Sequence, residues 1–371
     1  PAHRNGTCDM TFDFFDRLRP IGLAPAHREA LLHAFDTLPD AQRDARPARV
    51  TEVHRETAVL DDGDAPTTAR LHPHVAHLLR SGDDALAVGD WVLIWRDAHG
   101  GDWIVARAAP LTRIVRRNAD GLRHVVVSNV DTALLVMGLD GDYNPRRLER
   151  FVALVRADPG IVPVAVLTKR DWAGEAVALD EAEHLAQRLG GSVPVHAVNA
   201  LDPSTAVELA PYLGPGRTAV LLGSSGAGKS TLTNTLIGRD VMDTGAVRAA
   251  DSRGKHTTTH RALHRLPGGG CVIDTPGVRT LRPDLDAEAL ASSFEDIATL
   301  ASQCRFRDCR HQQEPGCAVR AAVDADRLAN WHKLGRELRR DSLTLLERQQ
   351  QLAEWKARSR GAKERMRLKR G

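Results

Sequence analysis

A phosphate-binding loop is the clearest chemical signature of the chain. Residues 223–230 fit the pattern G-x-x-x-x-G-K-[ST], between an apolar run at 218–222 that predicts a buried strand and a run at 231–237 that predicts a helix. The backbone N–H groups of such a loop wrap a polyphosphate, Lys229 reaches its β- and γ-phosphates, and the Ser230 hydroxyl ligates Mg²⁺. The residues expected to contact the nucleotide here are Gly223, Ser224, Ser225, Gly226, Ala227, Gly228, Lys229, Ser230 and Thr231.

A second phosphate-sensing element follows at the end of an expected strand. Residues 274–277 match D-x-x-G, the element with which GTPases sense the γ-phosphate. Asp274 is expected to hold Mg²⁺ through water, and the Gly277 N–H to contact the γ-phosphate. In the polar loop at 253–260 we expect Thr258 to ligate Mg²⁺ when a triphosphate is bound; the alternative is a solvated, threonine-rich loop.

A guanine-reading motif precedes the phosphate loop. Guanine carries N1–H and 2-amino donors that adenine lacks, so a carboxylate that accepts from both selects guanine. Residues 168–171 fit the usual N-K-x-D except at the first position. Asp171 would read the base and the Lys169 stem would cover its plane, whereas Thr168 in place of asparagine is expected to lose one contact to the base or the phosphate loop. The expected base-contacting residues are Thr168, Lys169, Arg170, Asp171, Asn199 and Ala200.

The order of these motifs is that of a circularly permuted domain. In an ordinary GTPase the base-reading elements follow the phosphate loop, and here they precede it. The surrounding sequence alternates a strand region at 125–137, a helix at 145–157, a strand at 161–167, a helix at 175–189, a strand at 193–198, a helix at 203–213 and a strand at 270–273. We therefore expect an α/β domain with a mostly parallel sheet. The segment after Gly277 passes directly to a C-terminal domain, so the γ-phosphate state can steer that domain.

A metal-binding pattern follows. Cys304, Cys309, His311 and Cys317 suit tetrahedral Zn²⁺, and because protein fills all four positions we expect a structural site with one ion per chain. The alternative is three unlinked buried cysteines beside a surface histidine. The chain has five cysteines, an odd number with three in one cluster, which favours a reducing compartment over a disulfide framework.

The first third of the chain has short alternating apolar and polar runs instead of long strand and helix patterns. Short alternating runs at 49–53, 56–60, 67–71, 90–96 and 102–107 predict a small closed β-barrel of the OB type. Such a barrel either binds an oligonucleotide or is purely structural, and composition does not separate these alternatives. A helix is expected at 25–38, with no assigned role.

Length and composition set the outer limits. A chain of 371 residues, 42% hydrophobic and with net charge +3, should fold as two or three domains. We expect an N-terminal extension with one helix at 1–45, the barrel at 46–113, the permuted GTPase domain at 114–283 and a helical zinc-binding domain with a basic tail at 284–371. No apolar run approaches the ~18 residues of a membrane span, so we expect no membrane partner.

The combination resembles one known family. The permuted motif order, the threonine triplet at 257–259, the run C-R-H-x-x-E-P-G-C at 309–317 and the run V-G-D-W-V at 88–92 are similar to the small-ribosomal-subunit-dependent GTPase A family, RsgA. The resemblance implies a multidomain protein with an OB-fold β-barrel, an α/β circularly permuted P-loop GTPase domain and a small α-helical zinc-binding domain. It also implies GTP hydrolysis stimulated by the small ribosomal subunit during late maturation of that subunit. We expect the subunit and its rRNA as partners, and a cytoplasmic, monomeric protein. Asn199 replaces the usual serine, without expected consequence because that loop contacts the base through its backbone.

The catalytic machinery is expected to be incomplete without a partner. Val278 follows the D-x-x-G motif where Ras-like enzymes place a water-orienting glutamine, so isolated turnover should be slow. By the resemblance, His256 is the candidate for the residue that orients the attacking water. The alternative is that His256 is simply a solvated histidine in a polar loop. The basic tail at 356–371 either binds RNA or is a solvated helix end. Two rival functions remain open: an RNA-binding assembly factor for which GTP is only a structural ligand, and an ATP-using enzyme.

Overall fold

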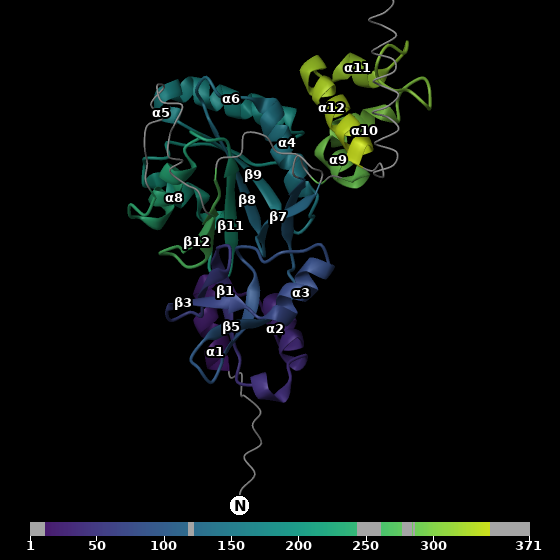
Figure 1. Cartoon of the computed structure of the whole chain (residues 1–371). Coiled ribbons are helices and arrows are strands. Elements are labelled where there is room, and N and C mark those ends of the chain that lie inside the picture. Colours follow the sequence, from purple (N-terminus) through teal and green to yellow (C-terminus); the bar gives the residue numbers. More distant parts are fainter. Residues whose placement is uncertain (1–11, 118–121, 243–260, 277–283, 285, 342–371) are drawn as a thin grey trace, which may run out of the picture.

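The computed structural model describes residues 12–117, 122–242, 261–276, 284 and 286–341. Three bodies follow one another along the molecule (Figure 1): a β-barrel with the N-terminal helices, an α/β unit in the middle, and a helical C-terminal unit at the far end. The multidomain architecture expected from the sequence is therefore confirmed. The residue limits of the domains stay a division that we propose.

The barrel is closed and has five strands, as predicted. Its strands are β1 (Arg46–Val53), β2 (Thr57–Asp61), β3 (Pro66–Leu71), β4 (Trp91–Arg96) and β5 (Asp102–Arg107). They pair in the order β1-β2-β3-β5-β4, and β1 closes the barrel on β4. Alternate residues such as Val50, Leu60, Ile94 and Ile104 point inward and form a small separate core. A helix that the sequence did not signal, α3 (Pro73–Ser81), connects β3 to β4.

The N-terminal segment is packed onto the barrel and the α/β unit. It contains α1 (Phe12–Leu18), the 3-10 turn η1 (Arg19–Ile21), the predicted helix as α2 (Pro25–Asp36), and η2 (Asp40–Gln42). Arg49 of β1 is fully buried and donates to the Ile21 carbonyl, to the Thr218 hydroxyl at 2.7 Å and to the Asn129 carbonyl at 2.8 Å. Gly22, at φ 88°, passes so close to this guanidinium that a Cβ would collide with it. One buried arginine thus joins all three segments.

The region at 125–137, expected as one strand region, is two strands with different partners. β7 (Arg123–Ser128) pairs antiparallel with β6 (Arg113–Arg117) in a separate hairpin. β8 (Thr132–Gly138) enters the main sheet. Asn129 between them has φ 54°, and this left-handed residue ends the first strand.

The central sheet has six strands in the order β10-β9-β8-β11-β13-β12. The first five are parallel, and β12 is an antiparallel edge strand that the sequence analysis missed. The remaining strands are β9 (Val162–Thr168), β10 (Val195–Ala197), β11 (Thr218–Gly223), β12 (Ala262–Arg265) and β13 (Cys271–Asp274). The helices are α4 (Pro145–Arg156), α5 (Arg170–Ala173), α6 (Glu175–Arg188), α7 (Ser204–Leu209) with the 3-10 turn η3 (Ala210–Tyr212), and α8 (Lys229–Ile237). Apolar side chains cover both faces of the sheet, as expected for a parallel α/β unit.

The C-terminal unit is helical and packs on α4. It contains α9 (Ala287–Ser293), α10 (Glu295–Ala301), α11 (Ala318–Ala322) and α12 (Ala325–Asp341). Phe294, Ile297, Val319 and Leu334 form its small core together with Ala153 of α4. α12 reaches Asp341, the last residue of this unit that the structure describes.

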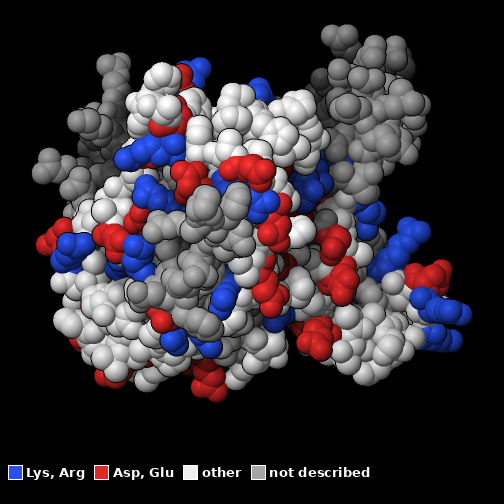
Figure 2. Space-filling model, turned by 90° about the horizontal axis from the view of Figure 1, so that it is seen from below, with Lys and Arg blue, Asp and Glu red and all other residues white. Residues whose placement is uncertain are grey.

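Two surface properties complete the description. Seen from the barrel end, acidic and basic side chains are interspersed over the face instead of forming patches of one sign (Figure 2). None of the described helices is both long and apolar enough to cross a bilayer.

Candidate functional site: a nucleotide site and a metal centre

The predicted nucleotide-binding elements meet at one edge of the sheet. β9 ends at Thr168, β11 at Gly223 and β13 at Asp274, and these strands are parallel members of one sheet. Their carboxyl ends therefore lie side by side, which is where open α/β sheets bind ligands. The base-reading motif, the phosphate loop and the D-x-x-G aspartate come from distant parts of the sequence and converge there.

The phosphate loop has the backbone that its glycines predict. Gly226 and Gly228 adopt left-handed conformations, at φ 80° and 88°, and the loop then enters α8. Lys229 is 6% exposed, and its Nζ donates to the carbonyl oxygens of Gly223 at 3.1 Å and Ser224 at 2.9 Å. The ammonium group is therefore held over the loop, where the phosphates of a nucleotide would lie.

Asp274 is a buried acid without a well-formed hydrogen bond. It is 1% exposed, and neither carboxylate oxygen accepts a bond of good geometry from any described residue. Burial raises the pKa of Asp274 to about 6, and the nearby Lys229 ammonium and Ser230 hydroxyl act in the opposite direction. Burial likewise lowers the pKa of Lys229, an effect that Asp274 opposes. Two orphaned oxygens beside the Ser230 hydroxyl fit a hydrated Mg²⁺ ion.

Several predicted residues lie outside the described part of the chain. Thr258 and His256 fall within 243–260, and Gly277 and Val278 fall within 277–283. Their roles stay predictions. Thr275 is described and lies two residues before the second of these ranges. Its hydroxyl donates to the Leu221 carbonyl at 2.6 Å and so fixes β13 to β11, the strand that leads into the phosphate loop.

Thr168 retains a contact to the phosphate loop. Its hydroxyl donates to the carbonyl oxygen of Ala227 at 2.7 Å, within the phosphate loop, and its side chain is fully buried. Replacing asparagine with threonine therefore leaves the tether between the base-reading motif and the loop in place. The contact that Thr168 gives up relative to asparagine is the one to the base.

Lys169 and Asp171 are presented at the start of α5. Lys169 has φ 65°, and its Nζ forms an ion pair with Asp140 in the loop after β8. Its stem runs across Gly138, where a Cβ would lie 3.2 Å from the Lys169 Cδ and Cε atoms. Asp171 is exposed to solvent, so its carboxylate is available to a base.

The second base-contacting loop is a tight turn. The Asn199 side-chain oxygen accepts from the Leu201 N–H at 3.0 Å, and the Asn199 carbonyl accepts from the Thr205 hydroxyl at 2.7 Å. The Ala200 carbonyl accepts from the Thr235 hydroxyl of α8 at 2.5 Å. The Asn199 side chain is thus used within the turn, consistent with base contacts made by the backbone.

The sequence analysis missed a polar group beside the phosphate loop. Arg147 of α4 binds both oxygens of Asp142, at 2.6 and 3.1 Å, and donates to the Ser224 hydroxyl at 2.9 Å. α4 begins at Pro145, and the Asn144 side chain caps it by accepting from the Arg147 N–H at 3.1 Å. No sequence pattern linked Arg147 to Ser224, because they are far apart along the chain.

The four predicted metal ligands form one cluster. Their ligand atoms all lie within 4.8 Å of one another. The Cys304 and Cys317 sulfurs are 3.9 Å apart, and the His311 Nδ1 lies 3.6 and 3.4 Å from them. A regular tetrahedral zinc site requires about 3.8 Å between sulfurs and about 3.5 Å from sulfur to nitrogen. Cys304, Cys309, His311 and Cys317 are therefore arranged to hold a metal ion.

The loop between the ligands is shaped by Glu314. Its carboxylate accepts from the backbone N–H groups of Arg310 at 3.1 Å, Gln312 at 2.8 Å and Gln313 at 3.1 Å. Backbone hydrogen bonds, led by that of its own N–H, lower the pKa of Glu314 to about 2. An ionised Glu314 thus helps His311 to keep its left-handed backbone, at φ 57°.

Comparison with known proteins identifies the family. The model of the RsgA GTPase family matches residues 107–283, and an ABC transporter model matches residues 208–368, which include the phosphate loop. The small ribosomal subunit biogenesis GTPase RsgA of Xanthomonas axonopodis pv. citri (strain 306) is 47% identical in an alignment of 339 positions that covers 87% of this chain and 89% of the relative. The chain belongs to the RsgA GTPase family. The homologue from Xanthomonas oryzae pv. oryzae (strain MAFF 311018) is 48% identical over 79% of this chain and 81% of its own.

Solved structures agree with the RsgA assignment. YjeQ from Thermotoga maritima matches with a TM-score of 0.56 and 25% identity, over 79% of this chain and 98% of that one. YloQ, a circularly permuted GTPase, matches in fold with a TM-score of 0.55 and 22% identity, over 83% of this chain and all of that one. The predicted permuted fold is confirmed, and as an RsgA-family member the chain is a GTP hydrolase. This assignment rejects the two rival functions.

Proposed function

We propose that this chain binds the small ribosomal subunit and hydrolyses GTP when that subunit stimulates it, during late maturation of the subunit. The observation that carries the proposal is the convergence of the Thr168–Asp171 motif, the phosphate loop and Asp274 at one sheet edge. The partner is inferred from the name of the relatives, small ribosomal subunit biogenesis GTPase. The contact to its rRNA, the monomeric state and the cytoplasmic location belong to the same proposal.

Each group has a role in this proposal. Asp171 accepts from the two guanine donors, the phosphate loop N–H groups and Lys229 hold the β- and γ-phosphates, and Gly277 senses the γ-phosphate. Mg²⁺ neutralises charge on the phosphates when bound, with Ser230, Thr258 and water held by Asp274 around it. His256 is the proposed water-orienting residue.

The metal at the C-terminal cluster is proposed to be Zn²⁺. Three thiolates and one imidazole nitrogen at near-tetrahedral separations favour zinc over harder cations. All four positions are supplied by protein, so the ion stabilises the fold of a unit whose own apolar core is small.

The permutation couples this unit to the nucleotide. The helical unit follows the D-x-x-G motif directly in sequence, so a change at the γ-phosphate acts on the segment that carries it. We propose that the GTP form binds the small subunit more tightly than the GDP form, by roughly 5- to 150-fold for an ordinary coupling. The basic tail at 356–371 adds affinity in both forms.

Cosedimentation tests the proposal. Purified small subunits are incubated with the chain and either a non-hydrolysable GTP analogue or GDP, at two salt concentrations. The proposal expects tighter binding with the analogue, and it expects removal of 356–371 to weaken both forms and flatten the salt dependence. Equal binding in both nucleotide states would reject the coupling.

A further inference from the structure

The three-residue group formed by Arg147, Asp142 and Ser224 closes a ring of hydrogen bonds at the phosphate loop. Two nitrogens of the Arg147 guanidinium donate to the Asp142 carboxylate, and Arg147 also donates to the Ser224 hydroxyl at 2.9 Å. The Ser224 hydroxyl in turn donates to Asp142 at 2.9 Å. Ser224 is 1% exposed, so its hydroxyl has no competing bulk water. Two loops and one helix are locked to one another here.

Ser224 connects this ring to the catalytic lysine. The same residue whose hydroxyl is held by Arg147 offers its carbonyl oxygen to the Lys229 Nζ at 2.9 Å. A shift of Ser224 therefore moves an anchor of Lys229. Arg147 acts on the phosphate-binding cation through a single residue.

The same turn of α4 is bound to the C-terminal helical unit. Glu149 is 1% exposed and accepts from Arg327 at 2.8 Å, from Asn330 at 2.6 Å and, within the α/β unit, from Arg188 at 2.8 Å. Arg150 pairs with Glu337 at 2.7 Å. Buried and bidentate pairs of this kind hold geometry firmly even where they add little stability.

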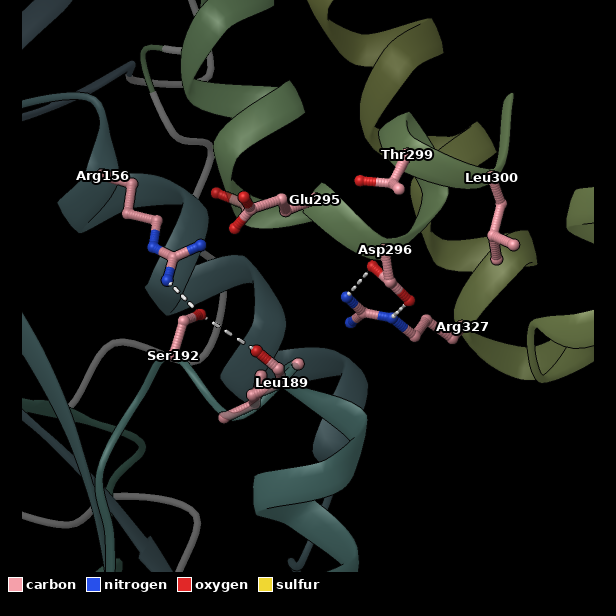
Figure 3. A pocket seen from close by; sticks show the side chains of 10 residues that line it. Arg156, Leu189, Ser192, Glu295, Asp296, Thr299, Leu300 and Arg327 are labelled. Carbon is pink, nitrogen blue, oxygen red and sulfur yellow. Dashed lines mark hydrogen bonds and ion pairs between the residues drawn. The ribbon is translucent and has the colours of Figure 1, made fainter. Parts of the chain in front are cut away.

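A cleft of about 320 Å³ marks the same junction (Figure 3). It lies between the C-terminal ends of α4 and α6 on one side and α9, α10 and α12 on the other. On one wall Arg327 binds Asp296 with two hydrogen bonds, and on the other Arg156 donates to Ser192 at 2.6 Å. The two units are thus joined by charged contacts around this cleft.

We propose that Arg147 is a positioning residue through which α4 couples the seating of the C-terminal helical unit to the phosphate loop. The two ends of the connection lie within one turn of α4: Arg147 reaches Ser224, and Glu149 and Arg150 reach α12. A displacement of α12 moves α4, and the ring transmits that displacement to the anchor of Lys229. That docking of the small subunit regulates Lys229 in this way rests on the proposed function, in which docking is the event that moves α12.

Coupling between Arg147 and α12 is shown by an interaction energy between the two sites and not by their proximity. The test is therefore a double-mutant cycle. Arg147→Gln removes the ring, and Asn330→Ala removes one contact between α12 and Glu149. Intrinsic GTP turnover, which needs no subunits, is measured for the parent, both single variants and the double variant. We expect Asn330→Ala to change kcat at least about fivefold in the parent and to have no further effect in the Arg147→Gln background.

Controls separate positioning from stability. The ring is partly exposed, with side-chain exposures of 25% for Arg147 and 52% for Asp142, so Arg147→Gln should leave the melting temperature nearly unchanged. Arg96→Gln, which breaks a comparable Arg–Asp pair on the barrel, should leave intrinsic kcat unchanged. Ser224→Ala should reproduce Arg147→Gln and be non-additive with it, and Arg147→Lys should recover part of the loss.

The outcomes are distinguishable from failure of the proposed function. Independent, multiplicative effects of Arg147→Gln and Asn330→Ala on kcat would overturn the coupling, whatever the subunits do. If the parent shows no stimulation by small subunits but the cycle is non-additive, the proposed function fails and the positioning role stands. Where stimulation is present, Arg147→Gln should reduce it at least about fivefold, and full stimulation in that variant would also overturn the proposal.

Discussion

The hydroxyl of Thr168 donates to the carbonyl oxygen of Ala227 at 2.7 Å, and this bond joins the base-reading motif to the phosphate loop. The hydroxyl has one proton, and it is used in this bond. An asparagine amide has two, so it could hold the loop and still donate to N7 or O6 of guanine. Thr168 therefore preserves the loop geometry and gives up donation to the base.

This relationship predicts the effect of restoring asparagine. Thr168→Asn should increase GDP affinity about tenfold, the gain expected from one added hydrogen bond of ~1 kcal/mol or slightly more. The gain should shrink with 7-deaza-GDP, which lacks the N7 acceptor, whereas the parent should bind GDP and 7-deaza-GDP equally. Titration calorimetry with both nucleotides measures this. A parent that discriminates strongly against 7-deaza-GDP would show that Thr168 does contact the base.

Asp171 is the predicted source of guanine selectivity. Asp171→Asn removes the acceptor for both guanine-specific donors, so GTP affinity should fall roughly 10- to 100-fold while ATP affinity changes little. Competition between the two nucleotides against a labelled GDP gives the ratio. A variant that still prefers GTP as strongly as the parent would exclude residues 168–171 as the base reader.

His27 predicts a specific pH dependence of stability. It is 5% exposed, and its Nδ1 accepts from the Ala24 N–H at 3.1 Å, so it is held neutral. Burial first, and the Arg49 charge second, lower the pKa of His27 to about 4. Between pH 6.5 and 4 the unfolded state binds the proton and the folded state does not, so stability falls as the pH falls through that window.

The size of the effect is roughly 3 kcal/mol, because the pKa of His27 is 6.5 in the unfolded chain and about 4 in the folded protein. His27→Gln removes the titrating group and keeps a side chain that can accept a hydrogen bond. The slope of the urea-unfolding free energy against pH between 4 and 6.5 should be smaller in this variant than in the parent. Parallel curves for the two proteins would show that His27 is not the responsible group.

The metal cluster predicts one bound Zn²⁺ per chain. Cys309→Ser should lose the ion and loosen the C-terminal unit, because metal binding contributes on the order of 10 kcal/mol to such small units. Elemental analysis of the purified protein, with far-UV circular dichroism before and after chelation, checks both points. Well-folded protein without metal would refute the site.

The nucleotide site was predictable because its residues follow local rules. Glycines at left-handed positions, an apolar strand before them and a helix after them define residues 223–230 from sequence alone. The spacing of Cys304, Cys309, His311 and Cys317 was equally informative, since ligands close in sequence can surround one ion. Barrel closure followed from five short alternating runs.

Other features depend on contacts that sequence does not encode locally. The run at 125–137 has two apolar stretches separated by mostly polar residues at 128–132, and the left-handed Asn129 among them divides it into β7 and β8 with different partners. The edge strand β12 is four residues long and carries little pattern of its own. Arg147 and Ser224 meet only because β8 and β11 are neighbours in the sheet, so their contact needed the fold.

The central claim is GTP hydrolysis at this phosphate loop, stimulated by the small ribosomal subunit. Single-turnover GTP hydrolysis by the full chain, with and without purified small subunits and with Lys229→Ala as the control, measures it most directly. The account predicts slow hydrolysis alone, at least tenfold faster hydrolysis with subunits (a barrier lowered by ~1.4 kcal/mol or more), and none above background for Lys229→Ala. Equal rates with and without subunits, or stimulated hydrolysis that survives Lys229→Ala, would contradict it.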